Sequence, residues 1–374
     1  MSDYRGNNPR ISRELSEWHA GIPALGALES DLPIVDPHHH LFGSAEDALH
    51  YRLDDLKRDL AGGHRVIGTV YVEAYESAWR KTGPQAMRPV GEVEMIVGLT
   101  SMPVQTPFGP CWVAAGAVAN ANLALGEAVA EVIEAEFVAA GGRLRGIRHH
   151  TASVDGRVGD LIKDRPRPHL MADAKFRRGL SLLDKYGLSF DSTVYHTQLF
   201  ELADLADAFP NTKIVVNHVG VPIGVAEFRS KRTEVLAQWE AGMRALASRP
   251  NVYVKLGGMG MPVFGFGFEQ GRTPATSLQV APAWQPLIDM CIELFGTERC
   301  MFESNFPVDK QSCSYTELWN GFKRTTRALS REERNHLFWR TACRVYGLSD
   351  LERYIDQLVD ARKLAGERGS PYMV

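Results

Sequence analysis

Hydrophobic and polar residues follow two alternating patterns along most of the chain. Short apolar runs rich in Val and Ile are separated by longer stretches in which apolar residues recur at helical spacing. The short runs predict eight strands, over residues 34–39, 65–73, 111–118, 144–149, 188–195, 213–218, 252–256 and 300–304. The longer stretches predict helices between several of these strands, over residues 123–140, 172–186, 199–209, 232–248 and 283–295.

This alternation of strand and helix is typical of a parallel sheet covered by helices. Eight such units match a (β/α)8 TIM barrel, which forms one domain even in chains of more than about 250 residues. The competing doubly wound sheet usually has a glycine-rich phosphate-binding turn after its first strand, whereas the first strand here ends in histidines. We therefore predict an α/β fold with a single (β/α)8 barrel.

The barrel is predicted over residues 34–347, with an N-terminal extension over 1–33 and a C-terminal helix and tail over 348–374. Two regions interrupt the rhythm. Residues 75–110 contain a helix that the pattern does not place, and residues 257–279, rich in Gly and Phe, form either a lid over the catalytic face or a surface insertion. Residues 315–347 predict two closing helices. A last helix over 351–364 packs on the barrel or on a second subunit, so a homo-oligomer is one expectation.

Composition narrows the class of protein. The chain has 374 residues, a net charge of -3 and 23% charged residues, which is ordinary for a globular protein and gives no sign of a nucleic-acid surface. No apolar stretch approaches the roughly 20 residues of a membrane-spanning helix, and the start of the chain is polar. The five cysteines are scattered, which predicts reduced thiols. We expect a cytoplasmic protein that acts on a small molecule and binds neither membrane nor nucleic acid.

The most informative motif ends the first predicted strand, where Asp36 and three histidines fall within five positions. Because side chains alternate across a strand, His38 and His40 share the face of Asp36 while His39 turns away. Neutral imidazole is the commonest metal ligand. The motif therefore predicts a histidine pair that grips a divalent ion or polarises a substrate oxygen; the alternative is a surface run of histidines without a role.

Polar residues also follow the other predicted strands. They are Arg148, His149 and His150 after the fourth, His196 after the fifth, His218 after the sixth, Lys255 in the seventh, and Glu303, Asn305 and Asp309 at or after the eighth. Catalytic residues of a barrel come from the C-terminal ends of several strands, so we expect these side chains to gather at one site. Taken singly, each is as well explained by a structural role.

Two of these residues carry specific expectations. The guanidinium of Arg148 offers a planar fork of donors that suits a substrate carboxylate, although an ion pair between strands would use it equally well. Lys255 lies within an apolar strand, where an unpaired ammonium is costly. It must therefore face a wet pocket or meet a carboxylate, for which Glu303 and Glu73 are the candidates.

Four motifs together resemble the amidohydrolase superfamily: Asp36-Pro-His-His-His40, Arg145-Gly-Ile-Arg-His149, Asn217-His-Val-Gly220 and Met301-Phe-Glu-Ser-Asn-Phe-Pro-Val-Asp309. More narrowly, the chain resembles its amidohydrolase-2 branch of metal-dependent TIM-barrel hydrolases, from about residue 34 to 347. The resemblance implies that His38, His40 and His196 hold a divalent metal, zinc or manganese, and that His218 lies beside the reacting carbon. A lactonase group within the resemblance works without a bound metal, so the metal is not an obligatory part of this expectation.

One position departs from the family pattern, because the aspartate that follows the eighth strand is Asn305 here. An amide cannot remove a proton from water, whereas a carboxylate can act as a general base. Asp309 or His218 is the expected substitute, and Asn305 would orient water or donate to an oxyanion. Arg148, His149, Lys255 and Glu303 are the expected substrate-binding residues.

The resemblance implies a hydrolase that attacks the carbonyl of a small carboxylated lactone, or of another ester or amide, with an activated water. Two alternatives remain open from the sequence. One is a metal-dependent, non-oxidative decarboxylase of aromatic acids, which resembles this branch but uses the aspartate that Asn305 replaces. The other is a catalytically silent barrel that serves as a binding protein.

Overall fold

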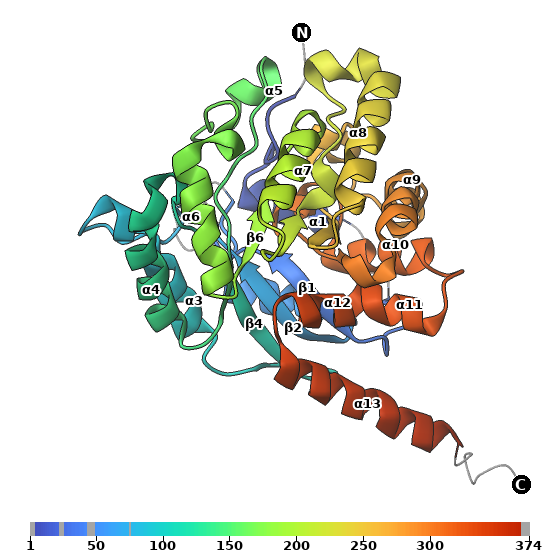
Figure 1. Cartoon of the computed structure of the whole chain (residues 1–374). Coiled ribbons are helices and arrows are strands. Elements are labelled where there is room, and N and C mark those ends of the chain that lie inside the picture. The colour runs from blue at the N-terminus through green and yellow to red at the C-terminus, as the bar shows by residue number, and fades with distance from the viewer. Residues whose placement is uncertain (1–3, 22–25, 43–48, 75, 368–374) are drawn as a thin grey trace, which may run out of the picture.

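The computed structural model describes residues 4–21, 26–42, 49–74 and 76–367, with side chains described up to residue 360. Eight parallel strands form one sheet in the order of a barrel (Figure 1). They are β1 Ile34–His39, β2 Val66–Val72, β4 Gly109–Ala119, β5 Leu144–Ile147, β6 Ser189–Ser192, β7 Ile214–Val216, β8 Val252–Leu256 and β9 Cys300–Phe302. The α/β barrel predicted from the alternation is therefore confirmed, with every predicted strand present.

The barrel closes through the segment that follows β9. The backbone N–H of His40 donates to the carbonyl of Phe306 at 2.7 Å, and the N–H of Asn305 donates to the carbonyl of His38 at 2.9 Å. These two bonds join β1 to the segment that follows β9. They also bring the histidine motif directly against Asn305, which the sequence separates from it by most of the chain.

The strands lie inside a ring of helices, and β1 and β2 are buried at every position. The helices are α2 Leu53–Leu60, α3 Val90–Leu99, α4 Val129–Ala140, α5 Arg157–Asp160, α6 Ala174–Lys185, α7 Leu199–Ala208, α8 Arg232–Ala247, α9 Ser277–Phe295, α10 Tyr315–Thr325, α11 Arg331–Asn335 and α12 Thr341–Val345. Burial on both faces explains why the strands read as continuous apolar runs.

The regions that the pattern left open have defined structures. Residues 75–110 contain α3 and a short strand, β3 Val104–Thr106, which pairs antiparallel with β4. Residues 257–279 follow β8 as a loop with two 3-10 turns before α9 begins at Ser277. This helix starts earlier than predicted, because Thr276 and Gln279 cap it and the helix continues through Pro282 and Pro286.

Both terminal regions of the chain contain a helix. Residues Ser12–Ala20 form α1, and α13 Ser349–Glu367 projects away from the barrel (Figure 1). Leu351, Ile355 and Val359 of α13 are buried, which confirms the predicted apolar spacing of this helix. The contact with a second subunit remains a prediction.

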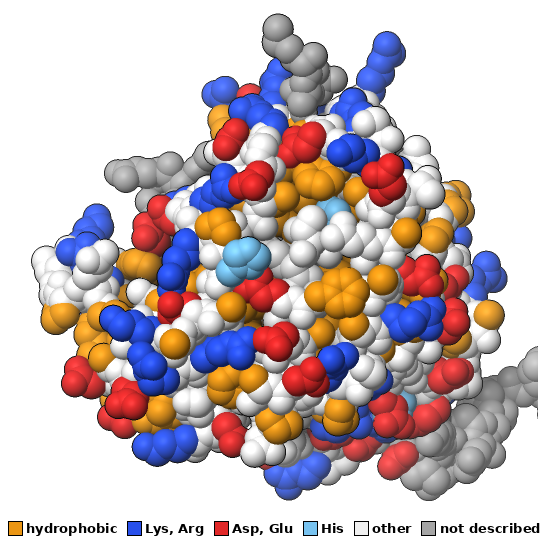
Figure 2. All heavy atoms as spheres, turned by 45° about the horizontal axis from the view of Figure 1, so that its top comes forward, with side chains coloured by type: hydrophobic (Ala, Val, Ile, Leu, Met, Phe, Trp, Pro, Cys, Tyr) orange, Lys and Arg blue, Asp and Glu red, His pale blue; other side chains and the backbone are white. Residues whose placement is uncertain are grey.

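No helix in the described part of the chain has the length and apolar content needed to cross a membrane. The face in Figure 2 carries acidic and basic side chains in alternation, without a large area of one sign. This agrees with the near-neutral net charge of the sequence.

Candidate active site

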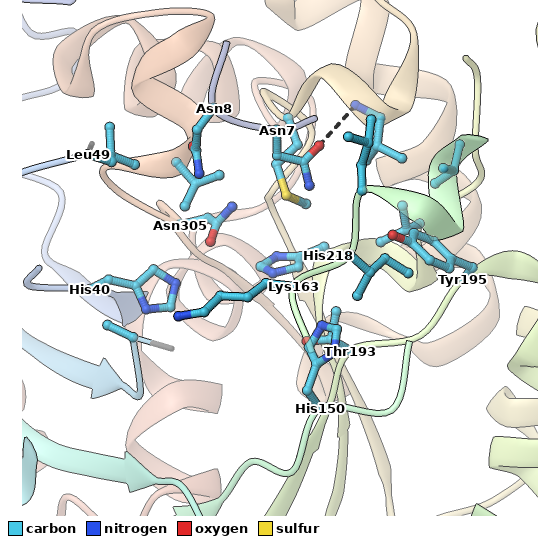
Figure 3. Close-up of a pocket in the computed structure, with 18 of the residues that line it drawn as sticks. Asn7, Asn8, His40, Leu49, His150, Lys163, Thr193, Tyr195, His218 and Asn305 are labelled. Atoms are coloured by element: carbon cyan, nitrogen blue, oxygen red, sulfur yellow. Dashed lines mark hydrogen bonds between the residues drawn. The ribbon is translucent and has the colours of Figure 1, made fainter. Parts of the chain in front are cut away.

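A cavity of about 340 Å³ opens at the C-terminal ends of the strands. Figure 3 shows polar side chains pointing into it from several loops. Of the residues expected from the sequence, His40, Arg148, His218 and Asn305 line it, together with His150. Barrel closure therefore brings together side chains from the ends of four different strands, as the (β/α)8 architecture predicts.

His38 and His40 meet at the floor of this cavity, with their Nε2 atoms 3.2 Å apart. His40 donates its Nδ1–H to the carbonyl of Val72 at 2.9 Å, so its Nε2 carries a lone pair. His39 turns away, as predicted, and its Nε2 lies 2.8 Å from the hydroxyl of Thr69. The strand alternation thus directs the outer two histidines of the motif to one point.

Glu303 holds two histidines in place. One carboxylate oxygen, Oε2, lies 2.6 Å from Nδ1 of His38, and the other, Oε1, lies 2.7 Å from Nδ1 of His218. The Nδ1–H of His218 donates to Oε1, which leaves Nε2 as the acceptor of that ring in its neutral tautomer. The approach of Oε2 to His38 is a close contact without hydrogen-bond geometry. Glu303 therefore fixes the tautomer of His218, and this role was not expected from the sequence.

The turn after β7 aims His218 at the cavity. His218, Val219 and Val221 all have positive φ, at 55°, 49° and 31°, a conformation that costs free energy in residues with a side chain. The backbone N–H of His218 is held by Glu303 at 3.1 Å. Gly258 packs against the ring of His218 so closely that a Cβ there would lie 2.3 Å from Nδ1. The position of His218 is thus set by backbone strain and by a glycine from the next loop.

Arg148 is already paired within the protein. Its Nε donates to Oε1 of Glu73 at 2.6 Å, and its Nη2 donates to the carbonyl of Glu73. Its Nη1 lies 3.4 Å from Nε2 of His38. Because Glu73 binds two of the three guanidinium nitrogens, the geometry favours a structural ion pair over the bidentate clamp for a substrate carboxylate that the sequence suggested.

Asn305 and Asp309 form a pair at the edge of the cavity. Asn305 donates its Nδ2–H to Asp309 at 2.6 Å, and the backbone N–H of Gly260 donates to the other carboxylate oxygen at 2.6 Å. The amide oxygen of Asn305 therefore points into the cavity (Figure 3). Burial raises the pKa of Asp309 well above its ordinary value. Asp309 is fully buried with both oxygens engaged, so it orients Asn305.

Lys255 is fully buried inside the barrel, beneath the histidines. Its partner is Asp191, at 2.8 Å, and neither Glu303 nor Glu73 takes this role. Tyr346 donates to the same oxygen of Asp191 at 2.6 Å. The ammonium of Lys255 also lies within hydrogen-bond distance of Nδ1 of His38, at 3.3 Å. Lys255 thus supports the site from below and does not line the cavity.

Two of the expected residues lie apart from the cluster. His196 begins a 3-10 turn beyond β6; its ring packs on Phe228 and its Nδ1 lies 3.4 Å from the N–H of Ile223. His149 accepts from the N–H of Leu123 at 3.2 Å and packs on Phe176. Neither lines the cavity: His149 faces away between the lining residues Arg148 and His150, and the 3-10 turn at His196 directs its ring to Phe228.

Asp36 joins the strand to the closing segment. Its carboxylate accepts from the backbone N–H of Ser304 at 2.9 Å and from the hydroxyl of Tyr315 at 3.0 Å. Burial raises the pKa of Asp36 to about 6, against the lowering effect of these donors. Asp36 therefore fixes the register between the histidine motif and the segment after β9.

The cavity keeps its imidazoles neutral. Burial, followed by the charge of Lys255, lowers the pKa of His38 well below its ordinary value, and burial followed by the charge of Arg148 does the same for His40. Burial also lowers the pKa of His150 to about 3. Neutral imidazoles with free Nε2 lone pairs can bind a metal ion or accept a proton from water.

The spacing of the histidine pair suits a divalent metal. Two nitrogens bound to zinc at about 2.05 Å in tetrahedral geometry lie roughly 3.3 Å apart, close to the 3.2 Å between the Nε2 atoms of His38 and His40. The buried group of His38, His218 and Glu303 could also hold a metal, with ligand atoms within 4.8 Å of one another. In that group Oε1 of Glu303 is bound by His218, while Oε2 has no hydrogen-bond partner among the described residues. The separation of the two Nε2 atoms beside the cavity is the closer match to the geometry of zinc.

Several lining residues were not expected from the sequence. Lys163, from the loop after β5, extends its ammonium across the cavity, and Tyr195 and Thr193 face it from the loop after β6 (Figure 3). Asn7 and Asn8 enter from the N-terminal extension. A lone Lys or Asn in a polar stretch gives no local signal of this kind, so only the folded chain identifies them.

The chain is similar to known hydrolases. The sequence profile of the amidohydrolase-2 family matches residues 111–348. An L-fucono-1,5-lactonase from Burkholderia multivorans is 30% identical over 212 residues, which cover 56% of this chain and 65% of that protein. An uncharacterized protein of Sinorhizobium fredii, y4mH, is 28% identical over 333 residues, covering 85% of this chain and 99% of its own.

A solved structure also has a similar fold. An amidohydrolase from Burkholderia multivorans with bound zinc superimposes with a TM-score of 0.63 at 24% identity, covering 84% of this chain and 99% of its own. The family profile, the barrel and the buried histidine cluster agree with one another. The chain therefore belongs to the amidohydrolase-2 family of hydrolases.

Proposed function

We propose that this hydrolase opens a small carboxylated lactone by adding water to its carbonyl carbon. The observation that carries the proposal is that His40 and His218 bind protein oxygens through Nδ1, which leaves their Nε2 atoms available beside a cavity of about 340 Å³. A cavity of this size suits a small molecule. The 30% identity to an L-fucono-1,5-lactonase supports a lactone as the substrate class.

His218 acts as the general base in this proposal. Its Nδ1–H is held by the Glu303 carboxylate at 2.7 Å, and its Nε2 is open to the cavity. A carboxylate in this position orients the ring and stabilises the imidazolium that forms when Nε2 takes a proton from water. His218 can then return that proton to the leaving alkoxide oxygen, so one residue serves both half-steps.

Asn305 and Arg148 complete the reaction site. The inward amide oxygen of Asn305 accepts a hydrogen bond from the attacking water and directs its lone pair at the carbonyl. Nη1 of Arg148 lies 3.4 Å from Nε2 of His38 and lines the cavity, and it stabilises the negative charge that develops on the carbonyl oxygen. Lys163 is placed to attract a substrate carboxylate (Figure 3).

A divalent metal, zinc or manganese, would be held by Nε2 of His38 and His40. When bound, it would polarise the carbonyl and lower the pKa of a coordinated water. The permanent charge of Arg148, 3.4 Å from His38, opposes a second cation at this point, and Asn305 supplies no carboxylate. His196 contacts Ile223 and Phe228 and is not among the residues that line the cavity, which argues against it as the expected third ligand.

The test is a panel of lactones, esters and amides, with released acid and released carbon dioxide measured separately. We expect acid release from lactones by the wild-type chain and loss of at least about 100-fold in His218→Ala, as is typical for a general base. Circular dichroism of the variant controls for folding. Carbon dioxide release without acid release would favour a decarboxylase, and no turnover of any compound would favour a silent barrel.

A further inference from the structure

The N-terminal extension crosses the catalytic face and forms part of the cavity wall. Tyr4 is buried, and Asn7 and Asn8 line the same cavity as His40 and His218. The sequence predicted only an extension here, with no part in the site. Figure 3 shows Asn7 above the histidines, on the opposite side of the cavity from His150.

This segment is fastened to the loops that follow β8 and β9. Arg10 exchanges two backbone hydrogen bonds with the side chain of Gln311, at 3.2 and 2.8 Å. The guanidinium of Arg10 lies 4.1 Å from the ring of Trp18, and the indole of Trp18 donates to the carbonyl of Gly271. His19 of α1 contacts the carbonyl of Lys310 at 2.8 Å. The extension is thus held in place after Asn7 by these contacts and before it by the buried Tyr4.

The carboxamide of Asn7 has a fixed orientation. Its oxygen accepts from the backbone N–H of Val263 at 3.3 Å and from the hydroxyl of Tyr4 at 3.2 Å. With the oxygen engaged, the amide nitrogen points down into the cavity (Figure 3). Within the described residues, that nitrogen has no hydrogen-bond acceptor. A donor held over a substrate cavity in this way can recognise only a group that accepts hydrogen bonds.

The other groups near the cavity strengthen this requirement. Lys163 brings positive charge to the lining, while Arg148 and Glu73 pair with each other and the carboxylates of Glu303 and Asp309 are engaged by His218 and Asn305. We infer that Asn7 is a specificity-determining residue that binds a carboxylate carried by the substrate in addition to its reacting carbonyl. The inference rests on the proposed function, because it takes the cavity as the substrate site.

Asn7→Asp is a specific test, because it keeps the acceptor oxygen that holds the residue and removes the amide donor that faces the cavity. An aspartate can still accept from Val263 and Tyr4, but it replaces the amide donor by a charged acceptor that repels a carboxylate. A purely structural role therefore predicts little change, whereas a recognition role predicts a loss. Asn211→Asp, at an exposed position remote from the cavity, is the matched control.

Binding is measured by calorimetry with two ring-opened acids, 2-hydroxyglutarate with two carboxylates and 4-hydroxybutanoate with one. We expect the wild-type chain to prefer the dicarboxylate, and Asn7→Asp to lower its affinity about 10-fold or more while the monocarboxylate changes less than about twofold. Asn211→Asp should behave as wild type. Thermal melting confirms that each variant is folded, and Asn7→Ala should give a smaller loss in the same direction.

The outcomes separate this inference from the proposed function. An unchanged ratio of the two affinities in Asn7→Asp, an equal loss for both acids, or no dicarboxylate binding by the wild-type chain would each overturn the inference. Kinetics with the two corresponding γ-lactones are run in parallel. If dicarboxylate binding depends on Asn7 but neither lactone nor any other compound of the panel is hydrolysed, the inference stands and lactone hydrolysis is rejected.

Discussion

The carboxamide of Asn305 donates a 2.6 Å hydrogen bond to the buried carboxylate of Asp309. The family's eighth-strand aspartate is therefore replaced here by an amide that has its own partner four residues later. Asp309 is also bound by the N–H of Gly260, so its carboxylate is positioned to accept from an amide at position 305. The amide oxygen is presented to the cavity as a neutral acceptor.

Asn305→Asp should therefore damage the protein. Two buried carboxyl groups would then lie within hydrogen-bond distance, and one must keep a proton. We expect the free energy of unfolding at pH 8 to fall by about 1–3 kcal/mol and the hydrolytic rate to fall about 10-fold or more. Denaturant unfolding and lactone kinetics measure both effects, with Asn211→Asp as the control. A gain in activity would instead indicate decay from an aspartate-containing ancestor.

The three adjacent histidines should differ in their contribution to catalysis. His40→Gln removes an Nε2 lone pair from the cavity floor, and we expect turnover to fall at least about 100-fold. His39→Gln removes a ring that contacts Thr69 on the opposite side of the strand, so the folded variant should keep most of its activity. Equal losses in kcat for two variants of equal thermal stability would contradict the proposed assignment.

Metal content should depend on the same pair. If the pair binds zinc or manganese, protein purified without a histidine tag should carry up to one ion per chain, and His40→Gln should carry at least about 10-fold less. Elemental analysis of the two proteins decides this. Metal retained in His40→Gln but lost in Glu303→Gln would instead place the ion at the Nδ1 side, in the group of His38, His218 and Glu303.

Lys163 should contribute to charge recognition. Its ammonium is half exposed and 3.8 Å from Glu76, so it remains screened by solvent and salt. We expect Lys163→Met to weaken 2-hydroxyglutarate binding about 3- to 10-fold at low ionic strength, with a smaller effect at high salt. Lys185→Met, on α6 away from the cavity, is the control. A loss that is independent of salt would argue against an electrostatic role.

Glu136 should make stability depend on pH. It is fully buried in α4 with no hydrogen-bond partner among the described residues. Burial, then the charge of Glu92, raises the pKa of Glu136 well above its ordinary value. Because the pKa is higher in the folded chain than in the unfolded chain, the stability that is present below the unfolded pKa is lost as pH rises through the folded pKa.

Glu136→Met should therefore stabilise the fold more at pH 8 than at pH 4, since the methionine never needs to ionise. Denaturant unfolding at the two pH values gives the difference directly. Glu131→Met, at an exposed position on the same helix, should show no such pH dependence. An identical change in stability at both pH values would show that Glu136 is ionised in the folded chain or is already compensated.

The sequence alone determined the barrel and its central histidine pair. Strand and helix periodicity are local properties, so eight apolar runs were enough to predict eight parallel strands. The pairing of His38 with His40 and the outward direction of His39 follow from the two-residue alternation of a single strand. Asp36, in the same strand, bonds Ser304 and Tyr315 and does not line the cavity with His40, and a register irregularity follows it before His39.

Only the tertiary structure decided which further groups reach the site. His149 turns to Leu123 and Phe176 while Arg148 and His150 on either side of it line the cavity, and His196 packs on Phe228 in a 3-10 turn. The strained turn at His218 aims that ring inward. Lys255 pairs with Asp191, and Arg148 pairs with Glu73. Each pair joins two different strands or the loops after them, so the sequence around either residue does not reveal its partner. Asn7, near the start of the chain, lines the same cavity as Asn305, near its end. Contacts between distant segments arise from barrel closure and loop packing, for which a local pattern carries no signal.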